Sequence, residues 1–308
     1  MLSRREILVG AGMAGASALA RPTTKVFASA EQNTPINFSV PAGACDCHTH
    51  IFDPRRFPYA STRGYTPEPA TVADLRSLQR ALHLERAVIV QPSVYGTDNS
   101  CALDAIKQFG PRARGIAIID DKTSKADLDQ MHRGGMRGVR DPDPLEPGTA
   151  RQLFKATIDR IRDRRSWHAE FFARLSEIEA IKDQVIASPV PISFDLFGGV
   201  QAALGLHQPG FDTLLSLVHS GKAYVNFTVP YRISKQAPDY PDVAPIAKAL
   251  IAANPQRITW GTDWAHTEGG RPFQVDDGHD LNLLATWTSG AAQLRQILVE
   301  NPARLYDF

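Results

Sequence analysis

The amino-acid sequence predicts an α/β fold, a single-domain (β/α)8 TIM-like barrel that follows an N-terminal export signal. Three observations support this prediction. Eight short apolar runs alternate with helical stretches, polar residues stand where these runs end, and residues 43–308 supply the roughly 250 residues that such a barrel needs. Continuous apolar runs are typical of parallel strands, because helices cover both faces of a parallel sheet.

The N-terminal residues have the composition of an export signal. Arg4 and Arg5 are adjacent and precede a weakly apolar, Gly/Ala-rich run that ends in the small-residue pattern ASA. This order is typical of a cleaved signal, and paired arginines indicate the twin-arginine type. An ordinary N-terminal helix is the alternative. The predicted segments are a signal at 1–30, a linker at 31–42 and the barrel at 43–308, and the mature protein is expected in the periplasm.

The overall composition excludes several classes of protein. The chain has 34 basic and 33 acidic residues, so its net charge of +1 indicates no nucleic-acid partner. Three cysteines are an odd number without framework spacing, which argues against a disulfide-stapled fold. No internal apolar stretch is long enough for a membrane-spanning helix, so the mature form is expected to lack a membrane anchor.

The predicted strands and helices follow one another along the chain. The first helical stretch places Val72, Leu75, Leu78 and Leu82 at helical spacing, and further helical stretches lie at 101–110 and 125–135. The strand candidates are 44–51, 86–93, 113–120, 136–141, 167–175, 189–198, 222–230 and 257–264. A doubly wound sheet is the alternative, but it would place a glycine-rich turn after the first strand, where this chain has HTHIFDP.

Polar side chains stand at the carboxyl ends of the predicted strands, where barrel enzymes carry their chemistry. The set comprises His48, His50, Ser93, Tyr95, Arg140, Asp195, Arg232 and Asp263. A random distribution would not put one such group after nearly every strand. The sequence therefore predicts a single site at this end of the barrel.

The first strand contains both histidines and cysteines. Because side chains alternate along a strand, Asp46, His48 and His50 are expected on one face, and Cys45 and Cys47 on the other. One site can then use the histidines or the cysteines, but not both. The cysteines are expected to pack as small apolar side chains.

Several segments resemble one known family. The segments GACDCHTHIFDP, AVIVQPSVYGTDN, GGMRGVR, RITWGTDWAH and NPARLY keep its order and spacing. They resemble the amidohydrolase superfamily, in the amidohydrolase-related (amidohydrolase 2) branch that contains 2-pyrone-4,6-dicarboxylate lactonase and galactarolactone isomerase. The resemblance extends from about residue 41 to residue 308 and also implies a barrel.

The resemblance implies roles for individual residues. Asp263 matches the general base that activates water, and His48 and His50 match the paired catalytic histidines. The positions that hold the carboxylates and the lactone of the substrate match Tyr65, Ser93, Arg140 and Arg232, and Tyr95 is added because it follows the same strand as Ser93. Arginine suits such a role because its guanidinium binds carboxylates through two parallel hydrogen bonds.

The chain departs from the family pattern at three positions. The family usually reads Asp-His-x-Gly-Arg where this chain reads Asp-Leu-Phe-Gly-Gly, so Leu196 replaces a third histidine and Gly199 replaces an arginine. Phe172 stands where a substrate-binding tyrosine is expected. The resemblance implies no cofactor, since this branch typically works without a metal. The alternative is zinc on His48, His50 and Asp263, because catalytic zinc needs three protein ligands.

The predicted activity is hydrolysis of a small anionic lactone, carboxylated or derived from a sugar acid. Two alternatives remain: a lactone isomerase of the same branch, and a degenerate barrel that binds a small acid without turnover. Three further questions stay open. Glu170 either meets a basic group inside the barrel or faces outward, Asp195 enters the site only if the register slips, and Asp276 and Asp277 either reach the site or cap a helix.

Overall fold

Eight parallel strands, hydrogen-bonded in the order β1 to β8, form the centre of the molecule. The computed structural model describes residues 34–141, 145–164, 166–268, 271–272 and 275–308, so the predicted signal lies outside the described residues. The strands are β1 (Cys45–Thr49), β2 (Arg86–Val90), β3 (Ala113–Ala117), β4 (Met136–Arg140), β5 (His168–Phe171), β6 (Ile192–Phe194), β7 (Ala223–Phe227) and β8 (Ile258–Trp260). Each lies within one of the eight predicted runs, which confirms the barrel.

The barrel closes where the chain beyond β8 meets β1. A parallel bridge joins Thr49 to Trp264, the amide of Asp263 donates to the His48 carbonyl (2.8 Å), and the amide of His50 donates to the Trp264 carbonyl (2.6 Å). Gly261 permits this approach, because a Cβ there would lie 2.6 Å from the His48 nitrogen. The closure therefore places two histidines beside an aspartate through contacts of the backbone.

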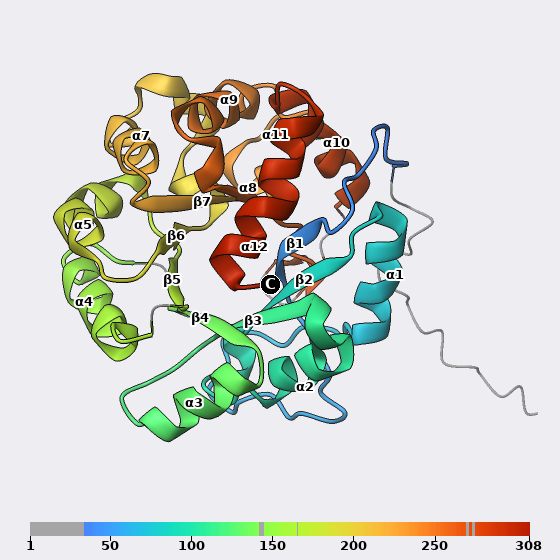
Figure 1. Cartoon of the computed structure of the whole chain (residues 1–308), viewed down its shortest axis with the longest axis vertical. Coiled ribbons are helices and arrows are strands. Elements are labelled where there is room, and N and C mark those ends of the chain that lie inside the picture. Colours follow the sequence, from blue (N-terminus) through green and yellow to red (C-terminus); the bar gives the residue numbers. More distant parts are fainter. Residues whose placement is uncertain (1–33, 142–144, 165, 269–270, 273–274) are drawn as a thin grey trace, which may run out of the picture.

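Helices surround the strands on all sides (Figure 1). The predicted apolar face of the first helix, α1, is buried against the core. The longer helices are α1 (Val72–Leu82), α2 (Ser100–Phe109), α3 (Lys125–Arg133), α4 (Ala150–Ile161), α5 (Leu175–Ala187), α7 (Phe211–His219), α9 (Val243–Ala253) and α10 (Asp277–Trp287). Shorter elements are η2 (Ser93–Tyr95), η3 (Gly110–Arg112), α6 (Leu196–Gly199), η4 (Ala202–His207), α8 (Pro230–Ile233), η5 (Pro255–Arg257), β9 (Thr267–Glu268), β10 (Arg271–Pro272), α11 (Ala291–Arg295), η6 (Gln296–Glu300) and α12 (Asn301–Tyr306).

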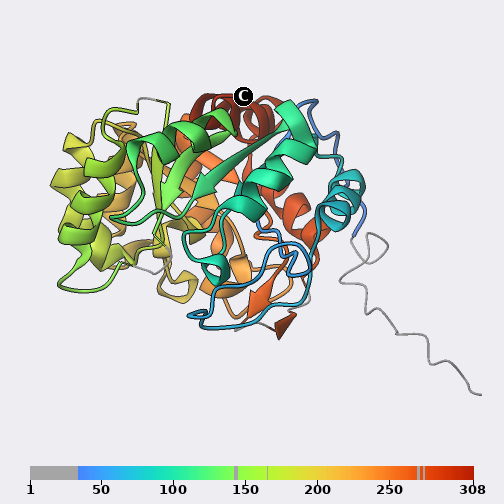
Figure 2. The same ribbon diagram turned by 90° about the horizontal axis from the view of Figure 1, so that it is seen from below.

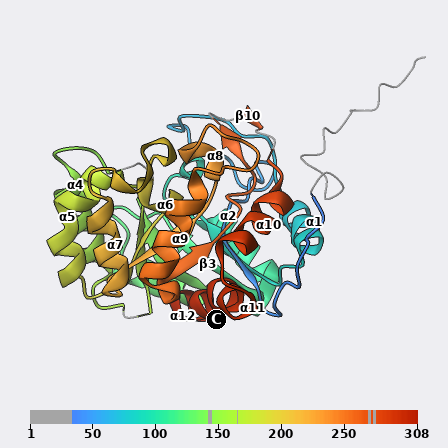
Figure 3. The ribbon, with the colours of Figure 1, turned by 90° about the horizontal axis from the view of Figure 1, so that it is seen from above.

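The two ends of the barrel carry different elements. Helix α12 and the C-terminus lie at one end, and α8 and the β9–β10 hairpin lie at the other, as Figures 2 and 3 show from two directions. Tyr306 is fully buried and packs in one apolar cluster with Cys45, Cys47 and Val88. The two cysteines are therefore packing residues, as predicted, and the amino-terminal end of the barrel is filled with side chains.

The segment predicted as a linker lies against the body of the protein from Thr34 onward. The Thr34 amide donates to the Asp276 carboxylate (2.8 Å), and the Asn37 amide donates to the Asn282 side chain (2.9 Å). Asp276 lies at the start of α10, and Asn282 lies within this helix. Among the helices that the structure describes, none has the length and apolar character required to cross a lipid bilayer.

Candidate active site

A cavity of about 240 Å³ opens at the carboxyl ends of the strands. Seven of the predicted site residues line it, from the ends of five strands and one further loop: His48, His50, Tyr65, Ser93, Arg140, Arg232 and Asp263. Five further residues complete the lining: Pro92, Phe172, Asp195, Leu196 and Thr267. Groups separated by more than 200 positions in sequence thus meet in one cavity.

Tyr95 is the exception among the predicted substrate-binding residues. It lies outside the cavity lining, its hydroxyl accepts a hydrogen bond from the Asp53 amide (2.8 Å), and its ring packs against Tyr59. The reason is local. Ser93 and Tyr95 belong to the single turn η2, so their side chains point in different directions. Tyr95 fixes the loop after β1 and takes no direct part in the cavity.

Asp263 lies between the two histidines. Its Oδ1 is 3.1 Å from Nε2 of His50 and 3.4 Å from Nε2 of His48. Burial alone would raise the pKa of Asp263, but the His50 contact and the charges of His48 and Arg232 outweigh burial and hold this pKa below its ordinary value. Asp263 is therefore a carboxylate at neutral pH.

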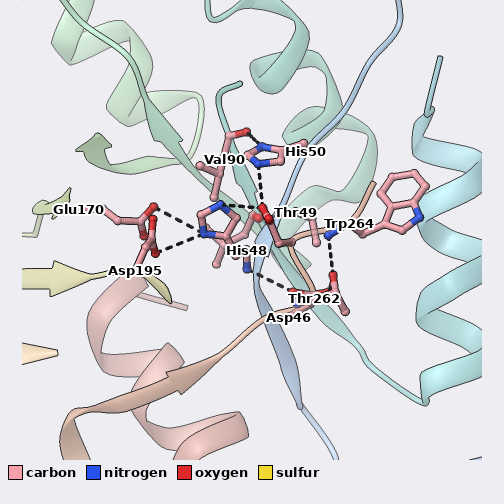
Figure 4. Close-up of polar contacts among 11 residues, drawn as sticks. Asp46, His48, Thr49, His50, Val90, Glu170, Asp195, Thr262 and Trp264 are labelled. Atoms are coloured by element: carbon pink, nitrogen blue, oxygen red, sulfur yellow. Dashed lines mark hydrogen bonds and ion pairs between the residues drawn. The ribbon is translucent and has the colours of Figure 1, made fainter. Parts of the chain in front are cut away.

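The opposite edge of the His48 ring, at Nδ1, meets two buried carboxyl groups. Its Nδ1 lies 3.4 Å from Asp195 and 3.7 Å from Glu170 (Figure 4). Burial would lower the pKa of His48, but Asp195, Glu170 and Asp263 together raise it to about 9. His48 is thus an imidazolium at neutral pH. This contact answers the open question about Glu170, which points into the barrel toward a basic group.

Glu170 and Asp195 are both buried, but their pKa values are shifted in opposite directions. Burial raises the pKa of Glu170 well above its ordinary value, and the neighbouring charge of Asp195 adds to the rise. Burial also acts to raise the pKa of Asp195, yet the charge of His48 outweighs it and lowers this pKa. Asp195 is therefore the main anion that balances His48, and the pKa values of the two carboxyl groups are shifted apart. The signal in the sequence was a polar residue inside the apolar run of β5 and another directly after that of β6.

His50 has a defined ring orientation. Its Nδ1 lies 2.8 Å from the Val90 carbonyl oxygen, an arrangement in which Nδ1–H donates and Nε2 faces Asp263. Burial lowers the pKa of His50, while the hydrogen bond and the charge of Asp263 act in the opposite direction. The pKa values of His48 and His50 are consequently shifted in opposite directions although both rings adjoin Asp263.

Asp46 does not join the histidines in the cavity, contrary to the simple alternation expected for β1. Its carboxylate accepts hydrogen bonds from the Thr262 amide (3.0 Å), the Thr262 hydroxyl (2.7 Å) and the His48 amide (3.2 Å). The register of β1 shifts between Asp46 and Thr49, so counting by two fails there. Asp46 instead connects β1 to the segment that carries Asp263.

Two arginines give the cavity a positive charge. Arg140 has a buried Nε without a hydrogen-bond partner, and within the described part of the chain its guanidinium makes no ion pair. Arg232 lies close enough for its charge to act on Asp263. Among the described residues that line the cavity, His48, Arg140 and Arg232 carry positive charge, and Asp195 and Asp263 carry negative charge. The cavity therefore favours an anionic ligand, because arginine stays charged in proteins.

Leu196 occupies the position of the family's third histidine and projects into the cavity. It begins a turn of four consecutive residues with positive φ, from Leu196 (φ 52°) to Gly199 (φ 69°). Left-handed backbone is unfavourable for leucine and phenylalanine, and such strain tends to occur at functional sites. Packing holds the turn in place, since the Phe197 ring stacks on Phe227 at 4.4 Å between centroids.

A supporting pair lies behind the base. Nε2 of His266 is 2.9 Å from the carboxylate of Asp277, and both side chains are buried. Asp276 caps helix α10, because its side chain accepts from the His279 amide (2.9 Å). The two aspartates thus divide the expected roles: Asp276 is a helix cap, and Asp277 holds His266 close to Asp263.

The residues around Asp263 also form a chemically suitable metal site. Ligand atoms of His48, His50 and Asp263 lie within 4.8 Å of one another, and the His50 ring presents Nε2 while its Nδ1 contacts a backbone carbonyl. Metal-binding histidines typically show this orientation. The donor set therefore fits a divalent cation such as zinc, provided that His48 gives up its proton.

Known proteins resemble this chain over nearly its full length. The amidohydrolase family matches residues 45–308. A 4-sulfomuconolactone hydrolase of Rhizobium radiobacter is 35% identical, with 89% of this chain and 93% of the relative covered. A 2-pyrone-4,6-dicarboxylate hydrolase of Comamonas testosteroni is 32% identical, with 87% and 92% covered. The crystal structure of an Agrobacterium tumefaciens protein without ligand is 26% identical, covers 89% of this chain and 97% of its own, and has a TM-score of 0.78. The predicted family is confirmed: this chain belongs to the amidohydrolase family.

Proposed function

We propose that the protein hydrolyses a lactone that carries an anionic group next to the ring, without a resident metal. The observation that carries this proposal is the guanidinium of Arg140, which forms no ion pair with any residue that the structure describes and shares a cavity with an ionised Asp263 and a protonated His48. A guanidinium with a buried Nε that no described group accepts from is suited to bind a carboxylate or sulfonate. The names of the relatives, both lactone hydrolases, support the same class of substrate.

The first step adds water to the lactone carbonyl. Asp263 takes one proton from the water as its oxygen forms a bond to the carbonyl carbon, and the π electrons of the carbonyl move onto its oxygen. The Nε2–H group of His48 donates a hydrogen bond to that oxygen and keeps its proton. The lowered pKa makes Asp263 a weak base, so the imidazolium must supply a large part of the stabilisation through the oxyanion.

The second step opens the ring. The electron pair returns to re-form the carbonyl, the bond between this carbon and the ring oxygen breaks, and the ring oxygen receives the proton that Asp263 carries. The product is the open-chain hydroxy acid, so the net reaction consumes one lactone and one water molecule. Asp195 keeps its negative charge throughout and holds the proton on Nδ1 of His48. Arg140 and Arg232 hold the substrate's anionic group.

The imidazolium of His48 takes the place that a cation would otherwise fill. A bound divalent metal would polarise the carbonyl and lower the pKa of water, and its ligands would be His48, His50 and Asp263. Binding such a metal requires removal of the His48 proton, which Asp195 and Glu170 oppose. We therefore assign the electrostatic role to protonated His48.

The central test replaces the base. Asp263→Asn keeps the shape of the side chain but removes the proton acceptor, so kcat should fall by about a hundred- to ten-thousand-fold. Binding should be maintained or improved, because a negative charge near an anionic ligand is gone. Arg232→Met should instead weaken binding. Turnover and ligand affinity are measured for both variants against a panel of anionic lactones.

Each outcome of this panel assigns one function. Parent-level turnover by Asp263→Asn would refute the mechanism. Conversion of lactones into isomeric lactones without ring-opened acid would show an isomerase, in which a hydroxyl of the substrate replaces water. Lactone binding without any conversion would show a binding protein.

The metal-free proposal has a separate measurement. Purified protein is expected to hold well under one equivalent of zinc, and treatment with a chelator should leave kcat/KM unchanged. Elemental analysis and the lactone assay are run on the same sample before and after chelation. Stoichiometric metal that is lost together with activity, and restored together with it, would make His48, His50 and Asp263 ligands and overturn the proposal.

A further inference from the structure

A second cavity of about 640 Å³ adjoins the catalytic cavity. Phe172, Leu196 and Arg232 line both and form the boundary between them. A substituent that extends from a ligand in the catalytic cavity past these three side chains would reach the second cavity. The mechanism proposed above uses the smaller cavity alone and leaves the larger one without a role.

The lining of the second cavity combines apolar and basic side chains. Val200, Tyr231 and Ile233 supply apolar surface, and Arg174 and Lys235 add positive charge to that of Arg232. Among the residues that the structure describes, no aspartate or glutamate lines it. Such a lining suits an arm that is apolar along its length and anionic at its end.

The two additional cations differ in whether a neighbouring carboxylate already balances their charge. Arg174 is already paired, with Nε 3.0 Å from Glu177 and a terminal nitrogen 3.5 Å from Glu146. Lys235 is exposed and makes no ion pair with any residue that the structure describes. No carboxylate that the structure describes therefore balances the charge of Lys235, whereas Glu177 and Glu146 balance that of Arg174.

We propose that this second cavity is a distal subsite, in which Lys235 binds the second anionic group of an elongated lactone. The substrate class is a lactone with one carboxylate or sulfonate at the ring, held by Arg140, and another at the end of an apolar arm. This inference rests on the proposed lactone hydrolase function and adds the length of the substrate to it. A single small ring would leave the larger cavity to solvent.

The experiment compares two synthetic γ-lactones with the same ring carboxylate. One has no other substituent, and the other also carries a 4-carboxyphenyl arm. For the parent, kcat/KM should be higher for the long lactone. In Lys235→Met the ratio of long to short should fall by about tenfold or more, since a charge-assisted contact is lost. In Lys222→Met, a control at an exposed lysine outside both cavities, the ratio should stay at the parent value.

Lys235→Arg keeps the charge and should keep most of the preference for the long lactone. An unchanged ratio in Lys235→Met would overturn the distal subsite while leaving lactone hydrolysis intact. If neither lactone is opened, the proposed function fails, and calorimetry with the two corresponding lactams still tests the subsite. The long lactam should then bind the parent more tightly than the short one, and Lys235→Met should abolish the difference. Equal affinities for the parent would refute the subsite.

Discussion

At the scale of single residues, His48 is the most constrained group in the cavity. Its two ring nitrogens face three carboxyl groups, those of Asp195 and Glu170 on one side and that of Asp263 on the other. The folded protein binds the His48 proton more tightly than an unfolded chain does, because its pKa is about 9 against an ordinary value of 6.5. The associated stabilisation is complete below pH 6.5 and is lost as the pH rises to about 9.

The same proton predicts the alkaline side of the activity profile. If protonated His48 polarises the carbonyl, kcat/KM should fall above about pH 9. Asp195→Asn removes the strongest anionic neighbour, and because a charge in contact shifts a pKa by about 1–3 units, the fall should move to lower pH by about one unit or more. The pH dependence of kcat/KM is compared with that of Asp212→Asn, an exposed aspartate on α7. Identical alkaline limbs in the parent and Asp195→Asn would exclude His48 as the acting cation.

At the scale of elements, the connection of β1 to the segment after β8 determines the geometry of the site. Asp46 accepts three hydrogen bonds, from both donors of Thr262 and from the His48 amide, and all of these groups are buried. The Thr262 hydroxyl in turn accepts from the Trp264 amide (3.0 Å). One carboxylate thus fixes the distance between the histidines and Asp263.

Removal of this connection should affect both stability and catalysis. Asp46→Ala leaves three buried donors without an acceptor, so the free energy of unfolding should fall by about 2–5 kcal/mol, and kcat/KM should fall with it. Asp46→Asn keeps one oxygen for the two amides, and its NH2 can donate to the Thr262 hydroxyl. Its loss should be under about 1 kcal/mol. Urea unfolding and lactone hydrolysis are measured on both variants, and an equal loss for the two would show that these hydrogen bonds are not the cause.

The same elements show how far prediction from sequence reaches. All eight strands were predictable, because a strand buried on both faces needs a continuous apolar run. Side-chain directions were less predictable. The register shift within β1 turns Asp46 toward Thr262, and the turn η2 turns Tyr95 away from the cavity. Neither irregularity leaves a mark in the hydrophobic pattern, since both result from contacts with distant segments.

At the scale of the whole molecule, one end of the barrel is packed with side chains and the other end holds the cavities. Tyr306 and the cysteines of β1 fill one end, and the cavities occupy the other. The described part of the N-terminal segment, from Thr34, runs along α10 and lines neither cavity. Cleavage after the predicted signal at residues 1–30 would therefore leave all the described cavity residues in the mature chain.

The proposed periplasmic location depends on Arg4 and Arg5. Replacing both by lysine keeps the charge but removes the guanidinium pair that the twin-arginine pathway recognises, so the protein should remain in the cytoplasm. Cell fractionation with a periplasmic marker enzyme measures this. Arg21→Lys makes the same change outside the pair and should leave export unchanged. Periplasmic protein at the parent level in the double variant would contradict the proposal.

The left-handed turn that begins at Leu196 has a consequence for which substitutions this protein can accept. The family pattern has an arginine where this chain has Gly199, but a Cβ at Gly199 would lie 1.9 Å from the Ala173 carbonyl oxygen. No side chain fits there while the Ala173 peptide keeps its present place. A single Gly199→Arg substitution would thus disrupt the local fold without supplying a useful guanidinium. Changes of ligand preference should therefore be sought at neighbouring positions such as Phe172 or Lys235.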